Sequence, residues 1–342
     1  MYLESIRLIN FRSYEDELFK LNPKLEVVVG PNGIGKTNLL EAIYLICQGK
    51  SFRLKKDAEL IKKGSDWARI EAIFDLEGKK EKRVLKLSLS GERLIRKLEI
   101  DGVNRIGSKH LLPIVVFEPD QMRMITESPD MRRLYLDERI SFLDYDYSKN
   151  LADYKRVNLQ RNRLLKQIKK GEAKKEDLFI WHIKMSELAA PIIKARRNYL
   201  EELNGKLEQD YRKVSKNKES VSVEYLPNFN MDDELKISNA MFNKLETDVE
   251  RDVITGFTRT GPHRDDWQIK LNSHNASTGA SRGEIRTLIL SLKLYEFEHL
   301  NESFGIRPLV LLDDVMSELD SSRRKELLRF FGDAQVVVSG VE

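Results

Sequence analysis

The segment Gly30–Thr37 constrains the fold of this chain more than any other, because it satisfies the phosphate-binding pattern G-x-x-x-x-G-K-[ST]. The β-branched run Leu25–Val29 precedes it, and a helical pattern follows over Lys36–Gln48. In this strand–loop–helix context, the glycines let backbone N–H groups converge on an anion at the helix N-terminus. The sequence therefore predicts an α/β lobe with a nucleotide site.

Two side chains of this segment supply chemistry as well as binding. The Lys36 ammonium can reach the β- and γ-phosphates of ATP, and the Thr37 hydroxyl can ligate Mg²⁺. We expect the ATP contacts to come from Gly30, Pro31, Asn32, Gly33, Ile34, Gly35, Lys36, Thr37 and Asn38.

A second motif, Leu309–Asp314, is an apolar run that ends in two carboxylates. This is the Walker B form, and it argues against the alternative that Gly30–Thr37 is a glycine turn without a ligand. We expect Asp313 to hold Mg²⁺, directly or through water, and Asp314 to orient or deprotonate the attacking water. Many related ATPases use Glu there, so the shorter Asp314 predicts slow hydrolysis. The alternative is an acidic pair that caps a helix.

The two motifs are distant in the chain, since 313 − 36 = 277 positions separate Lys36 from Asp313. We therefore expect one ATPase lobe split into residues 1–120 and 255–342, with a helical domain inserted at 121–254. Alternation of apolar and polar residues predicts antiparallel hairpins, a β-subdomain of about 67–107.

Strands are also expected at the start of the chain, over residues 2–9, 17–21 and 25–29. From about residue 148 the periodicity becomes helical and predicts two long helices joined near Gly171. The second helix is expected over Leu178–Tyr211, with a kink at Pro191.

A third motif, Ala280–Glu284, resembles the signature of ABC ATPases, because a Ser and a Gly open a helix shortly before the Walker B strand. In that family such residues contact the γ-phosphate bound by the opposite subunit. This assigns Ser281, Arg282, Gly283 and Glu284 to a site completed in trans, whereas ordinary helix capping is the alternative.

Other ABC motifs are present only in part. Ser317–Asp320 resembles the D-loop, with Ser317 and Asp320 as its site residues. No glutamine between Pro113 and Gln121 is assigned to a Q-loop, and Ser339-Gly340 stands where many ABC proteins have a switch histidine. The missing switch histidine again predicts slow hydrolysis.

Several further stretches resemble the RecF family of SMC-like ABC ATPases along the whole chain. They are Leu8–Tyr14, Asn38–Ala42, Ser51–Arg53, Pro129–Asp137 and Thr260–Asp266. The resemblance implies an α/β fold, an ABC/SMC-type P-loop ATPase head with an antiparallel β-subdomain and an inserted helical arm.

The same resemblance implies a function. RecF-like proteins form ATP-dependent homodimers, bind DNA at gaps and single-strand/double-strand junctions, and act with RecR and RecO to load RecA. It also implies a weak DNA-stimulated ATPase that uses ATP and Mg²⁺. Arg12 is then expected to reach the nucleotide, as the matching position does in SMC-like relatives, or alternatively only to pack the lobe.

The charge distribution is uneven in a way that suits this reading. Residues 149–218 hold 19 Lys or Arg against 9 Asp or Glu, an excess of +10, which leaves the remainder at +4 − 10 = −6. Phosphate contacts are expected from Lys155, Arg156, Arg161, Arg163, Lys166, Lys169 and Lys170. The alternative is a solvated basic face. No interleaved aromatic platform is evident in the sequence, which favours duplex or junction binding.

No catalytic or metal-binding role is expected for the remaining candidates. His263 and Arg264 have no Cys or His partner at metal-ligand spacing, so a structural or nucleotide-sensing role is expected. Cys47 lies in an apolar run and is expected to be buried.

The chain has no apolar stretch near the roughly 18 residues that cross a bilayer and no secretion signal, so a cytoplasmic protein without membrane contact is expected. Two other functions are weighed: an SMC-like chromosome-structural ATPase, which would need a longer arm, and a transporter's nucleotide-binding subunit, which would need a Q-loop and switch histidine.

Overall fold

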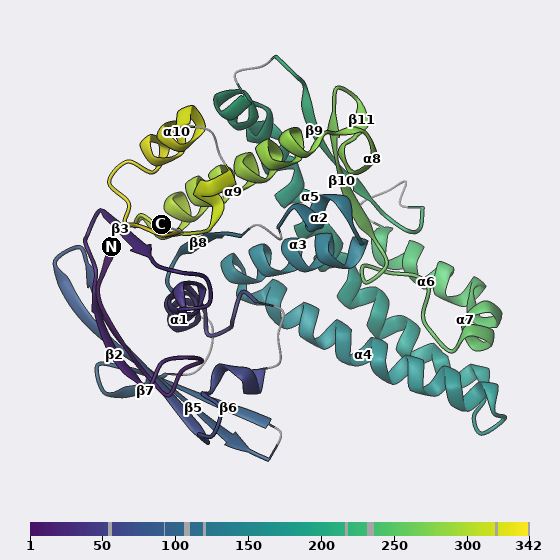
Figure 1. Ribbon diagram of the computed structural model, residues 1–342. Helices are drawn as coiled ribbons and strands as arrows, with labels where there is room; N and C mark the ends of the chain where they lie inside the picture. Colours follow the sequence, from purple (N-terminus) through teal and green to yellow (C-terminus); the bar gives the residue numbers. More distant parts are fainter. Residues whose placement is uncertain are drawn as a thin grey trace. The chain divides into compact units, whose positions relative to one another are not determined.

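The structure is a computed structural model that describes residues 1–53, 57–91, 93–105, 110–118, 121–215, 218–230, 236–318 and 321–340. It divides into two compact units, Met1–Gln121 with Ile289–Glu342, and Met122–Leu288 (Figure 1). Both combine helices with sheets, as the predicted α/β class requires.

A four-stranded parallel sheet in the first unit carries the nucleotide motifs. Its order is β3, β13, β12, β8. The strands are β3 Leu25–Val29, β8 Ile114–Phe117, β12 Leu309–Asp313 and β13 Val336–Gly340. In the register, Val338 lies opposite both Val27 and Leu312. Because all four strands run the same way, the loops after their carboxyl ends meet at one edge of the sheet.

A six-stranded antiparallel sheet forms the rest of the first unit's β structure, in the order β2, β1, β4, β5, β6, β7. The strands are β1 Tyr2–Ile9, β2 Asp16–Lys20, β4 Trp67–Leu76, β5 Lys79–Ser90, β6 Arg93–Ile100 and β7 Val103–Arg105. The predicted hairpins are thus present, but the sheet is larger than expected, because β1 pairs with β4 and brings β2 with it.

Two of the hairpin turns follow from their residues. Glu77-Gly78 and Asp101-Gly102 have positive φ at both positions, which the type I′ turn of a tight hairpin requires. These turns set the registers of β4 with β5 and of β6 with β7.

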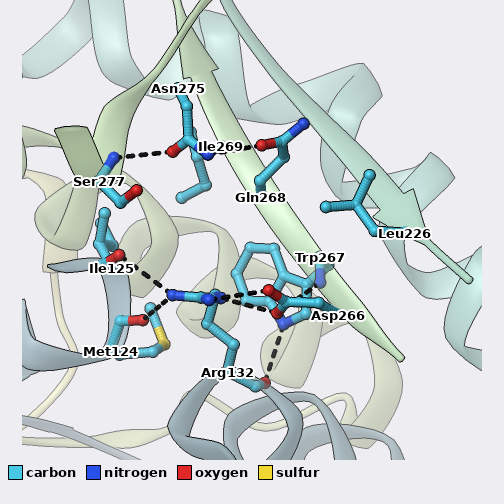
Figure 2. A pocket seen from close by; sticks show the side chains of 10 residues that line it. All are labelled: Met124, Ile125, Arg132, Leu226, Asp266, Trp267, Gln268, Ile269, Asn275 and Ser277. Carbon is cyan, nitrogen blue, oxygen red and sulfur yellow. Dashed lines mark hydrogen bonds and ion pairs between the residues drawn. The ribbon is translucent and has the colours of Figure 1, made fainter. Parts of the chain in front are cut away.

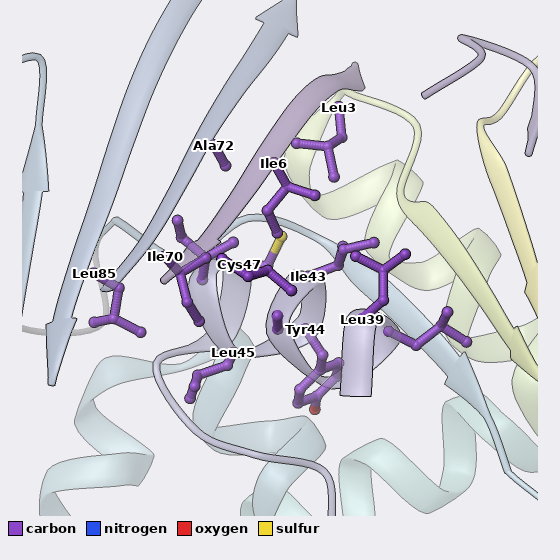
Figure 3. Close-up of a cluster of buried hydrophobic side chains, with 14 of the residues drawn as sticks. Leu3, Ile6, Leu39, Ile43, Tyr44, Leu45, Cys47, Ile70, Ala72 and Leu85 are labelled. Atoms are coloured by element: carbon purple, nitrogen blue, oxygen red, sulfur yellow. The ribbon is translucent and has the colours of Figure 1, made fainter. Parts of the chain in front are cut away.

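Helix α1 (Lys36–Gln48) packs its apolar side chains against strands of both sheets. Figure 3 shows Leu39, Ile43 and Cys47 of this helix gathered with Ile6 and Ile70 from β1 and β4. Cys47 is buried as expected, and burial raises the pKa of its thiol to about 12, so it stays protonated and inert. Among the described residues, this unit also contains α10 (Ser321–Phe331), the later part of the helix that spans Arg282–Phe304, and the 3-10 turns Asp57–Leu60 and Val315–Glu318.

One buried side chain ties the chain's first strand to its last. Gln335 is fully buried, and its amide Nε2 donates to the carbonyls of Leu3 (2.9 Å) and Asn22 (2.7 Å), while its Oε1 accepts from Leu3 N at 2.6 Å. A buried amide is tolerated because its polar atoms are paired. This contact holds β1 beside the start of β13.

The second unit contains the predicted helical hairpin. Helix α4 (Tyr145–Lys169) packs against α5 (Phe179–Ser215), and Gly171, with φ +78°, lies in the turn between them. Helix α5 continues through Pro191, which removes one backbone donor without ending the helix. The other helices are α2 Met122–Thr126, α3 Pro129–Leu143, α6 Ile237–Thr247, α7 Val249–Thr255, α8 Ala276–Gly279 and the 3-10 turn Lys175–Leu178. Helix α9 (Arg282–Phe304) crosses from the second unit into the first at Ile289.

A small antiparallel sheet in the second unit differs from the sequence expectation. It runs in the order β11 (His274–Asn275), β10 (Asp266–Leu271), β9 (Val221–Leu226). Residues 255–288, which the sequence analysis assigned to the ATPase lobe, group with the second unit, in which β10 pairs with β9.

Across the described part of the chain, no helix combines the length and apolar character needed to span a membrane.

Candidate functional site

The loop Gly30–Gly35 joins β3 to α1 and has the geometry of a phosphate cradle. Gly35 is the N-cap of α1 with φ +116°, a conformation that side chains disfavour. A Cβ there would lie 2.9 Å from Ser13 Oγ and 3.0 Å from Tyr14 OH, so both backbone and space require glycine. The Tyr14 hydroxyl donates to Gly35 O at 3.0 Å, and burial raises its pKa to about 12, so it remains a donor.

Lys36 opens α1 and is held inside this loop. Its Nζ donates to the carbonyl oxygens of Gly30 (2.6 Å) and Pro31 (3.1 Å). The loop residues 31–34 are exposed, while Lys36 is 9% exposed. An ammonium poised under an exposed ring of backbone donors is suited to a phosphate chain.

The ends of β12 and β13 meet α1 at the Asp313 carboxylate. Its Oδ1 accepts hydrogen bonds from Thr37 Oγ1 at 2.9 Å and from Ser339 Oγ at 2.7 Å. The Ser339 Oγ in turn accepts from the backbone N–H of Asp314 at 3.0 Å. Asp314 has φ +56°, an uncommon conformation for a non-glycine residue, and the Ser339 contact holds it.

Thr37 and Asp313 are fitted to hold Mg²⁺. Their oxygens lie 2.9 Å apart, close enough to face one cation, and both are hard oxygen donors of the type that Mg²⁺ prefers. Within the described ranges, no group of three His, Cys, Asp or Glu side chains could hold a metal alone. Mg²⁺ commonly binds through one or two protein ligands together with substrate phosphates, and Thr37 and Asp313 would supply two such ligands.

Two residues near this edge of the sheet had no role in the sequence prediction. Ser339 was noted only as a substitute for histidine, yet it contacts both Walker B residues. Gln121 follows β8, its Nε2 donates to Val116 O at 3.0 Å, and its Oε1 accepts no hydrogen bond from the described residues. The signal for both was their position just after an apolar strand run.

Arg12 forms an ion pair with a buried carboxylate. This contact corresponds to the second role weighed for Arg12, packing within the lobe. Glu41 is fully buried on α1, and it accepts from Arg12 Nε at 2.9 Å and from NH2 at 2.8 Å. Ser51 Oγ donates to the same carboxylate at 2.6 Å, and Arg53 NH1 lies 3.4 Å from it. Arg53 also donates to Asn38 Oδ1 at 3.0 Å. The family stretches around these residues therefore meet at one buried charge beside the phosphate loop.

The signature segment forms a capping box at the start of α9. Ser281 N donates to Glu284 Oε2 at 2.6 Å, and Glu284 N donates to Ser281 Oγ at 3.3 Å. These contacts, led by the backbone one, lower the pKa of Glu284. Ser281, Arg282 and Gly283 are exposed. The capping alternative is therefore realised in the single chain, and the exposed N-terminus remains able to meet an anion from a second molecule.

The D-loop prediction falls largely outside the described residues. Asp320 and the Ser317 side chain are not described, and only the backbone of Ser317 is, within the 3-10 turn Val315–Glu318.

Arg161 corrects the predicted set of DNA contacts. It is fully buried, where its NH1 donates to Asp252 Oδ2 at 2.7 Å and to Thr258 Oγ1 at 2.8 Å, and its NH2 lies 3.0 Å from His182 Nε2. It lies on the inward face of α4, so it cannot reach a phosphate. The other predicted contacts are exposed: Lys155, Arg156, Arg163, Lys166, Lys169 and Lys170.

His263 has a structural place in the second unit. Its Nε2 donates to Thr258 O at 3.0 Å, which makes Nδ1 the acceptor for the Tyr154 hydroxyl at 2.7 Å. Burial lowers the pKa of His263 to about 4, so the ring is neutral at neutral pH. Arg264, beside it, is exposed.

Figure 2 shows where two of the family stretches meet in the second unit. Arg132 pairs with Asp266 through two contacts of 2.8 Å, and Trp267 Nε1 donates to Arg132 O at 2.8 Å. The pocket beside them has a volume of about 50 Å³, far below what a nucleotide needs. These stretches therefore join α3 to β10 within the second unit, beside a cavity too small for a nucleotide.

Comparison with known proteins agrees with this geometry. The family model described as RecF/RecN/SMC N terminal domain matches residues 2–341. The DNA replication and repair protein RecF of Clostridium novyi (strain NT) is 34% identical over 346 residues, which cover 99% of this chain and 93% of that protein. The RecF of Moorella thermoacetica is 35% identical and covers 97% of this chain and 87% of its own.

Solved structures give the same result. The recombination mediator protein RecF-ATP of the RecFOR pathway is 32% identical, with a TM-score of 0.92, and covers 100% of this chain and 92% of its own. An Smc head domain from Pyrococcus furiosus, 17% identical with a TM-score of 0.51, covers 100% of this chain and 90% of its own and shares the fold. The predicted ABC/SMC-type head is thereby confirmed.

Removal of the buried Glu41 carboxylate is expected to destabilise the first unit strongly. Glu41→Ala leaves the Arg12 guanidinium, whose side chain is 9% exposed, with only a longer contact of 3.5 Å to the exposed Glu59 carboxylate. Loss of one member of a buried ion pair costs about 3–5 kcal/mol, measured by urea denaturation. Asp16→Ala breaks the exposed pair with Arg7 and serves as the control, with little expected change. Equal effects of the two variants would contradict a buried role for Glu41.

Acid is expected to destabilise the second unit through His263. The unfolded side chain, with a pKa near 6.5, binds a proton that the folded one, near 4, does not. The contribution of His263 to the free energy of unfolding is therefore fully present above pH 6.5, and it is lost as the pH drops toward 4. Urea denaturation at about pH 4.5, 5.5 and 7 should show a shallower pH dependence for His263→Gln than for wild type. The exposed His274→Gln is the control, and an unchanged slope in His263→Gln would refute the assignment.

Proposed function

The chain belongs to the RecF/RecN/SMC family, and we propose that it is an ATP-dependent DNA-binding protein of recombinational DNA repair and replication. The observation that carries the proposal is the convergence of Thr37 and Ser339 on Asp313 beside the phosphate loop, in a chain 32% identical to RecF-ATP over its whole length. Its reaction is the hydrolysis of ATP to ADP and phosphate.

Different residues of the first unit bind the phosphates, hold the metal ion and activate the attacking water. The N–H groups of the loop Gly30–Gly35 hold the phosphates, and Lys36 leaves its carbonyl partners to meet the β- and γ-phosphates. Thr37 and Asp313 would hold Mg²⁺, and the ion would supply positive charge beside the phosphates. Asp314 orients the attacking water and accepts its proton. Asp314 in place of Glu, together with Ser339 in place of histidine, supports slow turnover.

ATP is proposed to join two molecules. The exposed N-terminus of α9, with Ser281 and Gly283, contacts the γ-phosphate bound by a second copy, with Arg282 and Glu284 beside them. Binding of ATP thus closes a dimer, and hydrolysis opens it again.

DNA is proposed to lie along α4 of each arm. Lys149, Arg156 and Arg163 recur every seven residues and are exposed, so they line one face of α4, and Lys170 directly after the helix continues the spacing. Helical rise separates neighbours by about 10 Å, and such a row favours phosphate contacts without sequence preference.

Partners and location follow from the family relationship. We propose that the protein acts in the cytoplasm with RecR and RecO to load RecA at gaps and single-strand/double-strand junctions. A chromosome-structural role fits less well, because α4 and α5, with 25 and 37 residues, reach only about 40 and 55 Å.

The clamp is tested by sedimentation with ATP and Mg²⁺, with and without gapped duplex, at two salt concentrations. Wild type should change from a monomer to a DNA-bound dimer only when ATP is present. Lys36→Met should lose ATP binding, and Ser281→Arg should bind ATP but stay monomeric, because a bulky cation then blocks the surface in trans. Full ATP-dependent dimerisation of either variant would rule out the scheme.

Ser339 is expected to set the hydrolysis rate without affecting binding. In Ser339→Ala, the Asp313 carboxylate and the Asp314 N–H both lose a partner. The kcat should fall about tenfold, which corresponds to about 1.4 kcal/mol, while KM for ATP changes little. Ser339→Thr keeps the hydroxyl and should recover most of the rate. An unchanged kcat in Ser339→Ala would exclude this positioning role.

A further inference from the structure

Two exposed apolar side chains lie at the end of α7 and in the loop after it, beside the basic helix α4 of the arm. Ile254 is 68% exposed at the end of α7, and Phe257 is 48% exposed two residues beyond α7. Lys166 of α4 places its Nζ 5.0 Å from the centre of the Phe257 ring, and Lys169 Nζ donates to Ile254 O at 2.6 Å. Helix α7 lies beside the later turns of α4 (Figure 1). We call these four residues the arm patch.

The loop under the arm patch is held firmly from inside. Thr258 N and Oγ1 both donate to Asn162 Oδ1 at 2.7 Å, and Arg161 donates to Thr258 Oγ1. Asp252 accepts from Arg161 and from Arg259 N at 3.2 Å. The buried Arg161 thus fixes the backbone that presents Phe257. Ile254 at the end of α7 and Phe257 in the loop after it are therefore exposed on a backbone whose position is fixed, and exposed lysines and arginines surround them.

The charge around the arm patch selects its partner. Lys166 and Lys169 are exposed on α4, and Lys170 is exposed directly after it. Arg251 and Arg259 are exposed beside the loop. The cores of protein–protein interfaces are depleted in lysine, whereas an aromatic ring among lysines and arginines is the pattern that binds nucleic acid bases and phosphates together. The contact of Lys166 with the ring is weak at an exposed site, so this ammonium can move to a phosphate.

We propose that Ile254 and Phe257 form an apolar wedge that stacks on the exposed terminal base pair of a DNA junction, while Lys166 and Lys169 hold the adjacent phosphates. The inference rests on the proposed DNA binding and adds how a junction is distinguished from continuous duplex. Inside a duplex the base faces are covered, and only phosphates are offered to α4. At a junction one base-pair face is open, and an apolar side chain can cover it or enter between base steps.

The wedge is tested with the full chain, ATP and Mg²⁺, by fluorescence anisotropy on a gapped duplex and on a continuous duplex of the same length. Phe257→Ala should weaken binding to gapped duplex roughly tenfold and change binding to continuous duplex by less than about twofold. Ile254→Ala should act in the same direction. Lys169→Ala, which removes a phosphate contact, should weaken binding to both DNAs alike.

Two controls make the result specific. Trp67→Ala removes an equally exposed aromatic side chain from β4 and should leave both affinities unchanged. A 2-aminopurine at the terminal base pair of the gap should lose fluorescence on binding of wild type but not of Phe257→Ala, and Phe257→Trp should restore the response.

The outcomes separate the inference from the function on which it rests. If wild type binds no DNA, the proposed function fails, and the wedge with it. If wild type binds but Phe257→Ala keeps the same ratio of gapped to continuous affinity and the same 2-aminopurine response, the wedge is overturned, as it would be if this patch served a protein partner.

Discussion

The insertion of β13 between β3 and β12 is the constraint on which the first unit depends. Residues 336–340 pair with 25–29 on one side and with 310–313 on the other, so the two halves of the lobe meet in one sheet. Parallel pairing aligns the carboxyl ends of these strands. Asp313, Asp314 and Ser339 lie at these ends, and Lys36 and Thr37 open the helix α1 that follows β3. Gln335, which directly precedes β13, adds a contact with β1. Its buried amide is fully hydrogen-bonded only when the backbone of Leu3 in β1 lies beside it.

In both units, a buried carboxylate fixes the positions of the chain segments around it. Glu41 draws together Arg12 and Ser51, and Asp252 draws together Arg161 and the backbone of the loop that follows α7. An ionised group inside a protein is tolerated only when its partners surround it, so each such residue fixes the chain segments that supply those partners. In the first unit the fixed segment adjoins the phosphate loop, and in the second it carries Phe257.

Much of the nucleotide site was predictable, because its chemistry is local in sequence. The pattern Gly30–Thr37 dictates a turn with inward N–H groups, and an apolar strand that ends in Asp313 and Asp314 dictates where the carboxylates stand. The helical hairpin followed from apolar periodicity around a glycine turn. The extent of the sheets could not be predicted from the sequence. The pairing of β1 with β4, and of β10 with β9, joins distant segments, and the sequence of a strand does not specify which other strand it pairs with.

The sequence by itself determined the phosphate loop, the Walker B carboxylates, the helical arm and the family to which the chain belongs. Only the tertiary structure decided which arginine of α4 is buried and which is exposed, that Ser339 contacts both Walker B residues, and that Phe257 stands beside the lysines of the arm. The physical reason is the separation along the sequence of the residues that decide each feature. Backbone turns and helical faces are set by neighbouring residues, whereas burial and side-chain contact depend on which distant segments pack together.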